Sequence, residues 1–229
     1  MYNVDVDSRT LGVLYAGKAG ISRVLDQSSE RAAVAERLLL RELSHRINNE
    51  LASAINLISV AADRCGSNEA GTALTIVLDR LENYASVQHS LQMPECSATI
   101  ELTTYIHQLC RAISRSKLER QGIELSLSLY ALRMRSERCW LLGMIVFELI
   151  TNSARHAFSN GPGSIHVEVL PTETSIECRV SDNGRSEPNP RRGRGLTIVE
   201  ALAASLHGTV DVQSGPNGTT TVVSFPYGV

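Results

Sequence analysis

The chain lacks several features that would assign it to common classes of protein. No apolar run among its 229 residues approaches the roughly 20 residues that a membrane-spanning helix needs, and the N-terminus has no signal-peptide layout. A net charge of −2 gives no electrostatic case for a nucleic-acid partner. The sequence contains no internal repeat. These absences predict a cytoplasmic protein without a membrane span and without nucleic acid.

The cysteines exclude two further classes, because they form neither a disulfide framework nor a zinc site. They are odd in number, scattered and without metal-ligand spacing, which is typical of reduced thiols in a cytosol. The five are Cys65, Cys96, Cys110, Cys139 and Cys178. With 43% hydrophobic residues, the chain is long enough to bury one or two globular cores.

The first half of the chain contains two helical stripes. Apolar or small side chains recur at alternating three- and four-residue steps over residues 40–61, and a second stripe follows over residues 74–91. Gly66-Ser67-Asn68 interrupts the pattern, so we expect two long helices joined by a short turn. At about 100° per residue, His45 lies nearly opposite the first stripe and is expected to be exposed.

A later helix, expected over residues 140–157, carries polar groups at positions where a buried helix should be apolar. Glu148, Asn152, Arg155 and His156 share one face among otherwise apolar residues. Such groups are costly to bury unless each has a partner. A self-satisfied buried network would explain one or two of them, but four in register favour a ligand pocket with apolar walls.

The sequence after this helix indicates what the pocket binds. A predicted strand over residues 174–181 ends in Asp182-Asn183-Gly184, an acid followed by a turn. Further on, Gly193-Arg194-Gly195 directly precedes an apolar-periodic helix that starts at Leu196. Glycines at a helix start allow close backbone approach, and the exposed N–H groups favour an anion such as phosphate.

Together these motifs resemble the ATP-binding fold shared by histidine kinases, DNA gyrase and the MutL mismatch-repair ATPases. The resemblance implies ATP and magnesium as cofactors, with Asn152 as the magnesium ligand and Glu148 on the same stripe near the phosphates. It places a basic residue, Arg155, toward phosphate, and His156 belongs to the same pocket stripe. A hard cation such as Mg²⁺ prefers oxygen ligands, which an asparagine amide supplies.

The same resemblance assigns the remaining binding residues. Asp182 would accept a hydrogen bond from the adenine amino group, and Gly184 would let the base approach. Gly193 and Gly195 would flank the phosphates, and Gly218-Thr219 would contribute to the floor of the pocket. The segment between Gly184 and Gly193 is shorter than the usual nucleotide lid, which implies incomplete closure over ATP.

The helical hairpin suggests which branch of this superfamily the chain resembles. His45 lies in Leu43-Ser44-His45-Arg46-Ile47-Asn48-Asn49, ahead of the ATP-binding motifs. A lone surface histidine usually has no role, but this arrangement is similar to the dimerisation and phosphoacceptor region of sensor histidine kinases. The His-Arg-x-x-Asn pattern points to the HWE-like and related HisKA-type subgroup. Because the tryptophan–acid element of strict HWE kinases is missing, the sister subgroup is favoured.

The resemblance implies a two-component histidine kinase that autophosphorylates on His45 with ATP. The phosphate would pass to an aspartate of a response-regulator receiver domain, and the hairpin would form a homodimer. One alternative is a response-regulator phosphatase or phosphotransfer protein with weak or residual ATP binding, in which Asn49 positions a hydrolytic water. Another is a dimeric scaffold with a dead nucleotide site, against which Asn152, Asp182 and Gly195 argue.

We therefore expect an α+β chain, an antiparallel helical hairpin followed by an α/β sandwich of the histidine-kinase and gyrase ATPase type. Residues 1–28 are a lead-in, 29–95 the dimerisation and histidine phosphotransfer hairpin, and 96–229 the catalytic ATP-binding domain. Helices are expected over residues 102–117 and 140–157 and from Leu196, with strands over 123–129, 132–135, 164–170, 174–181, 209–213 and 219–225. A basic run, Arg111, Arg115, Lys117 and Arg120, is expected to be a solvated helix face.

Overall fold

The computed structural model describes residues 39, 42–65, 68–92, 98–158, 161–185 and 194–227. Its contacts divide the chain into two units, Met1–Ile47 and Asn48–Val229. The lead-in over residues 1–28, most of the lid with Gly193, and the expected turn at Gly66-Ser67 lie outside the described residues. Within the described part of the chain, no helix has the length and apolar character needed to cross a membrane.

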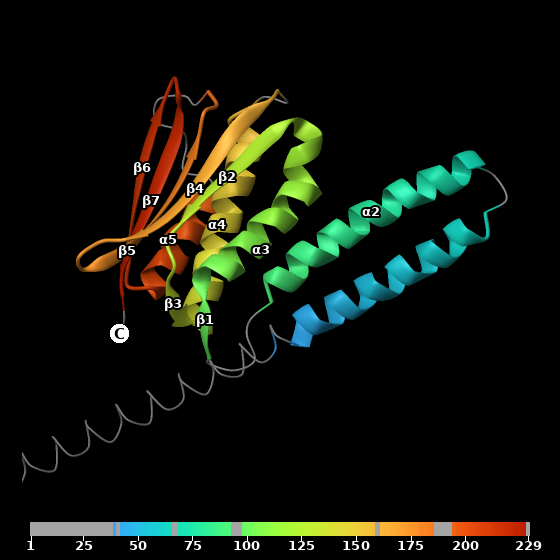
Figure 1. Cartoon of the computed structure of the whole chain (residues 1–229), viewed down its shortest axis with the longest axis horizontal. Coiled ribbons are helices and arrows are strands. Elements are labelled where there is room, and N and C mark those ends of the chain that lie inside the picture. Colours follow the sequence, from blue (N-terminus) through green and yellow to red (C-terminus); the bar gives the residue numbers. More distant parts are fainter. Residues whose placement is uncertain are drawn as a thin grey trace, which may run out of the picture. The chain divides into compact units, whose positions relative to one another are not determined.

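Two helices form the hairpin that the stripes predict. The described helix over residues 42–63 precedes α2 (Asn68–Ser90), and both are drawn in Figure 1. Several large apolar side chains on these helices remain exposed, among them Leu57, Ile76 and Tyr84. The two helices of the hairpin therefore carry more apolar surface than they bury against each other.

The chain after the hairpin contains a five-stranded mixed sheet. Its spatial order is β2-β4-β5-β7-β6, with β2 parallel to β4 and every other pair antiparallel. The strands are β2 (Ile123–Leu129), β4 (Gly163–Pro171), β5 (Ser175–Asp182), β6 (Thr209–Gly215) and β7 (Gly218–Pro226). Each lies within a few residues of its expected position, and β2 matches it at both ends.

Three helices pack on one face of this sheet: α3 (Leu102–Ile113), α4 (Ser136–His156) and α5 (Arg194–Ser205) (Figure 1). Alternate strand residues supply the core, so Ile165, Val167 and Val169 of β4 are buried while their neighbours are half-buried. This period of two is what a sheet covered on one side requires. The α/β sandwich predicted for the second domain is confirmed.

A small second sheet was not predicted in full. Strand β1 (Thr99–Glu101) pairs antiparallel with β3 (Arg133–Arg135). Helix α4 follows β3 directly and begins at Ser136, so the expected start at Trp140 is wrong. The backbone N–H of Ser136 donates to the carbonyl of Ala98 at 2.7 Å, and this bond holds the start of α4 beside β1.

The helix expected over residues 102–117 changes pitch before its end. Regular α3 stops at Ile113 and continues as a π-helical turn, η1 (Ser114–Leu118), then as a 3₁₀ turn, η2 (Glu119–Gln121). Ile113 and Leu118 are both fully buried, five residues apart. A π turn makes i→i+5 hydrogen bonds, so residues five apart share a face and both can reach the core.

Candidate nucleotide site

The carboxylate of Asp182 is the centre of a polar network at the end of β5. Its Oδ2 accepts a hydrogen bond from Ser153 Oγ of α4 at 2.7 Å. Its Oδ1 accepts from the backbone N–H of Gly184 at 3.1 Å and of Thr219 at 3.2 Å. A carboxylate has about four acceptor positions, so these three donors leave room for one more, such as an adenine amino group.

Two glycines beside Asp182 are required by close backbone packing. Gly218 has φ +127°, and a Cβ there would overlap the backbone carbonyl oxygen of Asp182. A Cβ on Gly184 would overlap the carbonyl oxygen of Ala157, at the end of α4. The structure therefore shows Gly184 packed against α4, whereas the sequence suggested only that it admits the base. These close approaches place the backbone N–H groups of Gly184 and Thr219 within hydrogen-bond distance of the Asp182 carboxylate.

Asn152 lies directly against the start of α5. A Cβ on Gly195 would overlap the side-chain amide of Asn152, so only a glycine allows this approach. The first N–H groups of a helix have no partner within the helix, and with the positive end of the helix dipole they favour phosphate. The structure thus brings together Asn152 and Gly195, two residues 43 positions apart that the sequence assigned to one pocket.

The rest of the polar stripe follows along α4. Glu148, one turn before Asn152, is half-buried, while Arg155 and His156 are exposed in the last turn of the helix. Cations at a helix C-terminus interact favourably with the helix dipole. The stripe is therefore at the surface of α4 over its second half, and not in the dry core that the apolar flanks suggested.

Lys117 is a neighbour of this stripe that sequence reasoning misplaced. The expectation of a solvated helix face holds for Arg111, Arg115 and Arg120, which are exposed, but Lys117 is half-buried. Its Nζ lies 4.8 Å from the centre of the Phe147 ring on α4. Burial lowers the pKa of Lys117, the Arg155 charge lowers it further, and Glu148 opposes both. The π turn carries Lys117 to this position.

The phosphoacceptor candidate lies on the hairpin. His45 and Asn49 are both exposed on the helix over residues 42–63. Beside His45, Arg46 Nε is 2.9 Å from Glu42 Oε1 in an exposed ion pair. An exposed pair of this kind contributes little to stability. The surface around His45 is therefore solvated, because His45 and both members of the pair are exposed.

Two family models match this chain, one after the other along the sequence. The first, described as histidine kinase, matches residues 42–117. The second, described as histidine kinase-, DNA gyrase B-, and HSP90-like ATPase, matches residues 140–228. Between them they span the helix that carries His45 and the strands and helices that hold Asp182 and Asn152. The chain belongs to the histidine kinase family. The ATPase-type domain of these kinases is an ATP-binding domain, as the sequence predicted.

The curated relatives of this chain are named as sensor and light-activated histidine kinases. Blue-light-activated histidine kinase 2 of Erythrobacter litoralis is 25% identical over 87% of this chain and 60% of its own length. Sensor histidine kinase PdtaS of Mycolicibacterium smegmatis is 25% identical over 94% of this chain and 46% of its own. The chain spans about half the length of the curated relatives that it matches.

Solved histidine kinases share the fold. The histidine kinase domain of the Erythrobacter litoralis EL346 blue-light activated kinase has a TM-score of 0.57 at 22% identity, covering 78% of this chain and 96% of that one. Full-length ShkA in complex with AMPPNP has a TM-score of 0.51 at 18% identity, covering 82% and 45%. The predicted hairpin followed by an α/β sandwich is thereby confirmed.

The donor set fits magnesium bridged to a nucleotide better than a protein-only metal site. Among the described residues, no three histidine, cysteine or acidic side chains converge on one point. Mg²⁺ in nucleotide sites uses one or two protein oxygens, several waters and the substrate phosphates. The amide oxygen of Asn152, at the α5 N-terminus and one turn from Glu148, meets that requirement.

Proposed function

We propose that this chain is an ATP-dependent protein-histidine kinase in which His45 is the phosphoacceptor and Asn152 is the magnesium ligand. The observation that supports it best is the pair of adjoining sites on α4. Ser153 holds the Asp182 carboxylate on one side of the helix, and Asn152 meets the α5 N-terminus through Gly195. An adenine acceptor and a phosphate-binding helix end are thus carried by consecutive residues of one rigid helix.

The chemistry assigns a distinct task to each residue. A neutral ring nitrogen of His45 attacks the γ-phosphorus, a P–N bond forms, and the bond to the leaving ADP oxygen breaks. Asp182 and Thr219 orient the base, while Arg155 and the α5 N-terminus offset phosphate charge. Asn152 would hold magnesium, which would supply positive charge against the phosphates. An aspartate of a response-regulator receiver domain then takes the phosphoryl group from His45.

The exposed apolar residues of the hairpin support a homodimer. Leu57, Ile76 and Tyr84 are 69%, 47% and 52% exposed, which is unusual for large apolar side chains on two adjacent helices of a water-soluble protein. A four-helix bundle from two chains would cover such surfaces. We propose this bundle for residues 29–95, with 96–229 as the catalytic domain, in a cytoplasmic protein. A light-scattering mass of one chain at micromolar concentration would reject the dimer.

The test of the kinase is the His45→Gln variant incubated with labelled ATP and magnesium. We expect it to take up no acid-labile, base-stable phosphate, while calorimetric affinity for ATP stays nearly unchanged. Asn56→Gln is the matched control, because Asn56 is also exposed on this helix but outside the motif. Label on the His45→Gln protein would overturn the assignment of His45.

The phosphatase reading predicts a different result from the same assay. In that case the natural protein would not label itself but would clear phosphate from a phosphorylated receiver domain. Asn49→Ala would then abolish clearance, because its exposed amide would no longer position water. Self-labelling that depends on His45 excludes this reading as the main activity.

A further inference from the structure

Strand β2 is one edge of the main sheet, and its outer side has no neighbouring strand among the described residues. The sheet order places β2 at one end, paired only with β4 over all seven of its residues. Natural edge strands are commonly blunted by lysine, proline, a bulge or very short length. The sequence of β2, Ile-Glu-Leu-Ser-Leu-Ser-Leu, has no lysine, proline or bulge, and its one charged residue, Glu124, alternates onto the opposite face of the sheet from Leu125 and Leu127.

The backbone of β2 turns its unused hydrogen-bonding groups toward this edge. Tyr130 N–H donates to Val169 of β4, and the Gly122 carbonyl accepts from Gly163, so even-numbered residues here face β4. Because N–H and C=O alternate sides along a strand, the odd-numbered residues, including Leu125 and Leu127, point theirs toward the open edge. A strand laid along this edge would find donors and acceptors already aligned.

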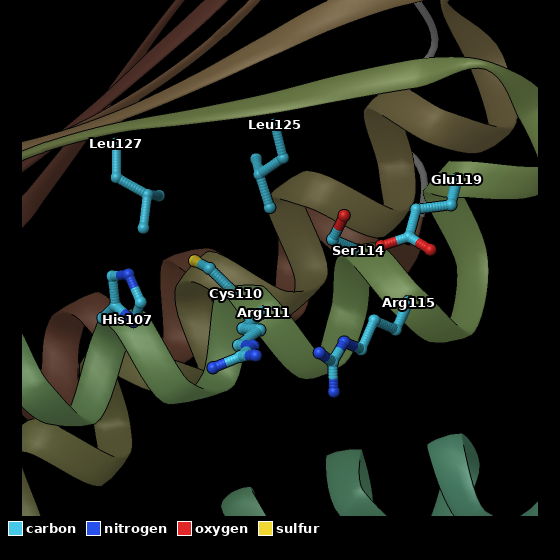
Figure 2. A pocket seen from close by; sticks show the side chains of 8 residues that line it. All are labelled: His107, Cys110, Arg111, Ser114, Arg115, Glu119, Leu125 and Leu127. Atoms are coloured by element: carbon cyan, nitrogen blue, oxygen red, sulfur yellow. The ribbon is translucent and has the colours of Figure 1, made fainter.

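A groove lies directly under the same two leucines. A cavity of about 380 Å³ is bounded by β2 above and by α3 and η1 below, and it is separate from the nucleotide site. Figure 2 shows Leu125 and Leu127 pointing from β2 toward the helix, with Cys110 pointing back toward them. Both leucines are only half-buried. Burial raises the pKa of the Cys110 thiol to about 12, so it stays neutral.

The helix side of the groove is predominantly basic. Arg111 of α3 and Arg115 of η1 are exposed and line it, with His107 near one end and a single acid, Glu119, near the other (Figure 2). None of these arginines is used by the nucleotide site. A groove with an apolar side on β2 and a basic side on the helices, beside a free strand edge, matches a ligand that is extended, partly apolar and acidic.

We propose that an extended segment of another protein, with apolar and acidic side chains on one face, adds as a strand to the free edge of β2. Its apolar side chains pack on Leu125 and Leu127, and its carboxylates pair with Arg111 and Arg115. Main-chain hydrogen bonds supply affinity in this binding mode, and the side chains that enter the groove supply specificity. A second copy of this chain fits less well, because two such edges would bring the two basic rims together.

The test uses the full chain and a short synthetic peptide. Threonine occupies every second position of the peptide, and the positions between are valine and glutamate by turns. When this peptide pairs with β2, its valines and glutamates all face the groove. We expect amide hydrogen exchange to slow at Leu125 and Leu127, which face the edge. Exchange at Ser126 and Ser128, whose amides already face β4, should not change. A peptide with lysine in place of glutamate, and one with N-methylated amides, should not bind.

Charge reversal separates the groove from general electrostatic attraction. Arg115→Glu should weaken binding of the glutamate peptide by about tenfold and strengthen binding of the lysine peptide. Arg120→Glu is the matched control, because Arg120 is also exposed, on the following 3₁₀ turn, but does not line the groove, and its reversal should have little effect. The thermal midpoint of both variants checks that neither loses the fold.

Four results would overturn the proposal. They are no binding at millimolar peptide, binding without slowed exchange at the two leucines, equal affinity for the lysine peptide, and an equal effect of Arg120→Glu. Concentration-dependent protection of the same leucine amides without peptide would show that a second copy occupies the edge instead.

Discussion

Replacing Asp182 by asparagine tests whether the buried carboxylate binds the nucleotide base. The side chain keeps its size, and the remaining oxygen can still accept from the N–H groups of Gly184 and Thr219. The new amide can donate to Ser153 Oγ, which reverses that bond without removing it. The protein should therefore fold, but the acceptor proposed for the adenine amino group becomes a donor.

The magnitude follows from one charged hydrogen bond. A hydrogen bond to an ionised group contributes about 1.5–3 kcal/mol, and each 1.4 kcal/mol corresponds to about tenfold in affinity. Two amino groups that face each other cannot form this bond, so we expect ATP to bind about ten- to a hundredfold more weakly. GTP, whose guanine presents an oxygen where adenine has an amino group, should lose less.

Calorimetric titration with a non-hydrolysable ATP analogue and with its GTP counterpart measures both effects. Asp211→Asn is the matched control, because Asp211 is an exposed acid on β6 that accepts a hydrogen bond from Gln213. That variant should bind ATP as the natural protein does. Unchanged ATP affinity in a folded Asp182→Asn protein would refute the assignment of the base site. A loss of equal size for ATP and GTP would show that the carboxylate acts through the fold and not through the base.

Three other perturbations have outcomes that the structure sets. Gly195→Ala should abolish magnesium-dependent nucleotide binding in a folded protein, since its Cβ would displace the Asn152 amide; calorimetry with magnesium and with chelator checks this. Lys117→Met should keep the packing on the aromatic ring but weaken ATP by a few-fold, an effect that shrinks in high salt because the group is half-exposed; a salt-independent loss would argue for a direct, dry contact. Burial raises the pKa of Cys178 to about 12, so its thiolate is nearly absent at pH 8. Iodoacetamide should therefore label the half-buried Cys65 well before Cys178, and equal labelling rates by mass spectrometry would contradict this.

The large elements could be predicted because their patterns are local. The strand over residues 123–129 alternates leucine with polar residues, and a period of two is visible without any knowledge of neighbours. Strand β1 could not be predicted in this way. It has only three residues, and its partner β3 lies 34 positions further along the chain. Pairing over that separation depends on how the helix between them packs.

The site residues were predictable by type but not by partner. Asp182 stands at a strand end before a turn, which marks it as a candidate. Ser153 was missed, since its role depends on a contact across 29 positions between a helix and a strand. Lys117 was misjudged for another reason. The π turn changes the angular step per residue, so a helical projection at the ordinary step places its side chain on the wrong face.

The π turn also determines how the length of this segment can vary. Ile113 and Leu118 are buried five residues apart. Deleting one residue between them would leave a spacing of four, which an ordinary α-helix also places on a single face. The core contacts would survive the deletion, and only the polar side chains in between would rotate. Deletion of one residue at this turn would therefore change which cation faces α4 while the buried contacts of the fold are kept.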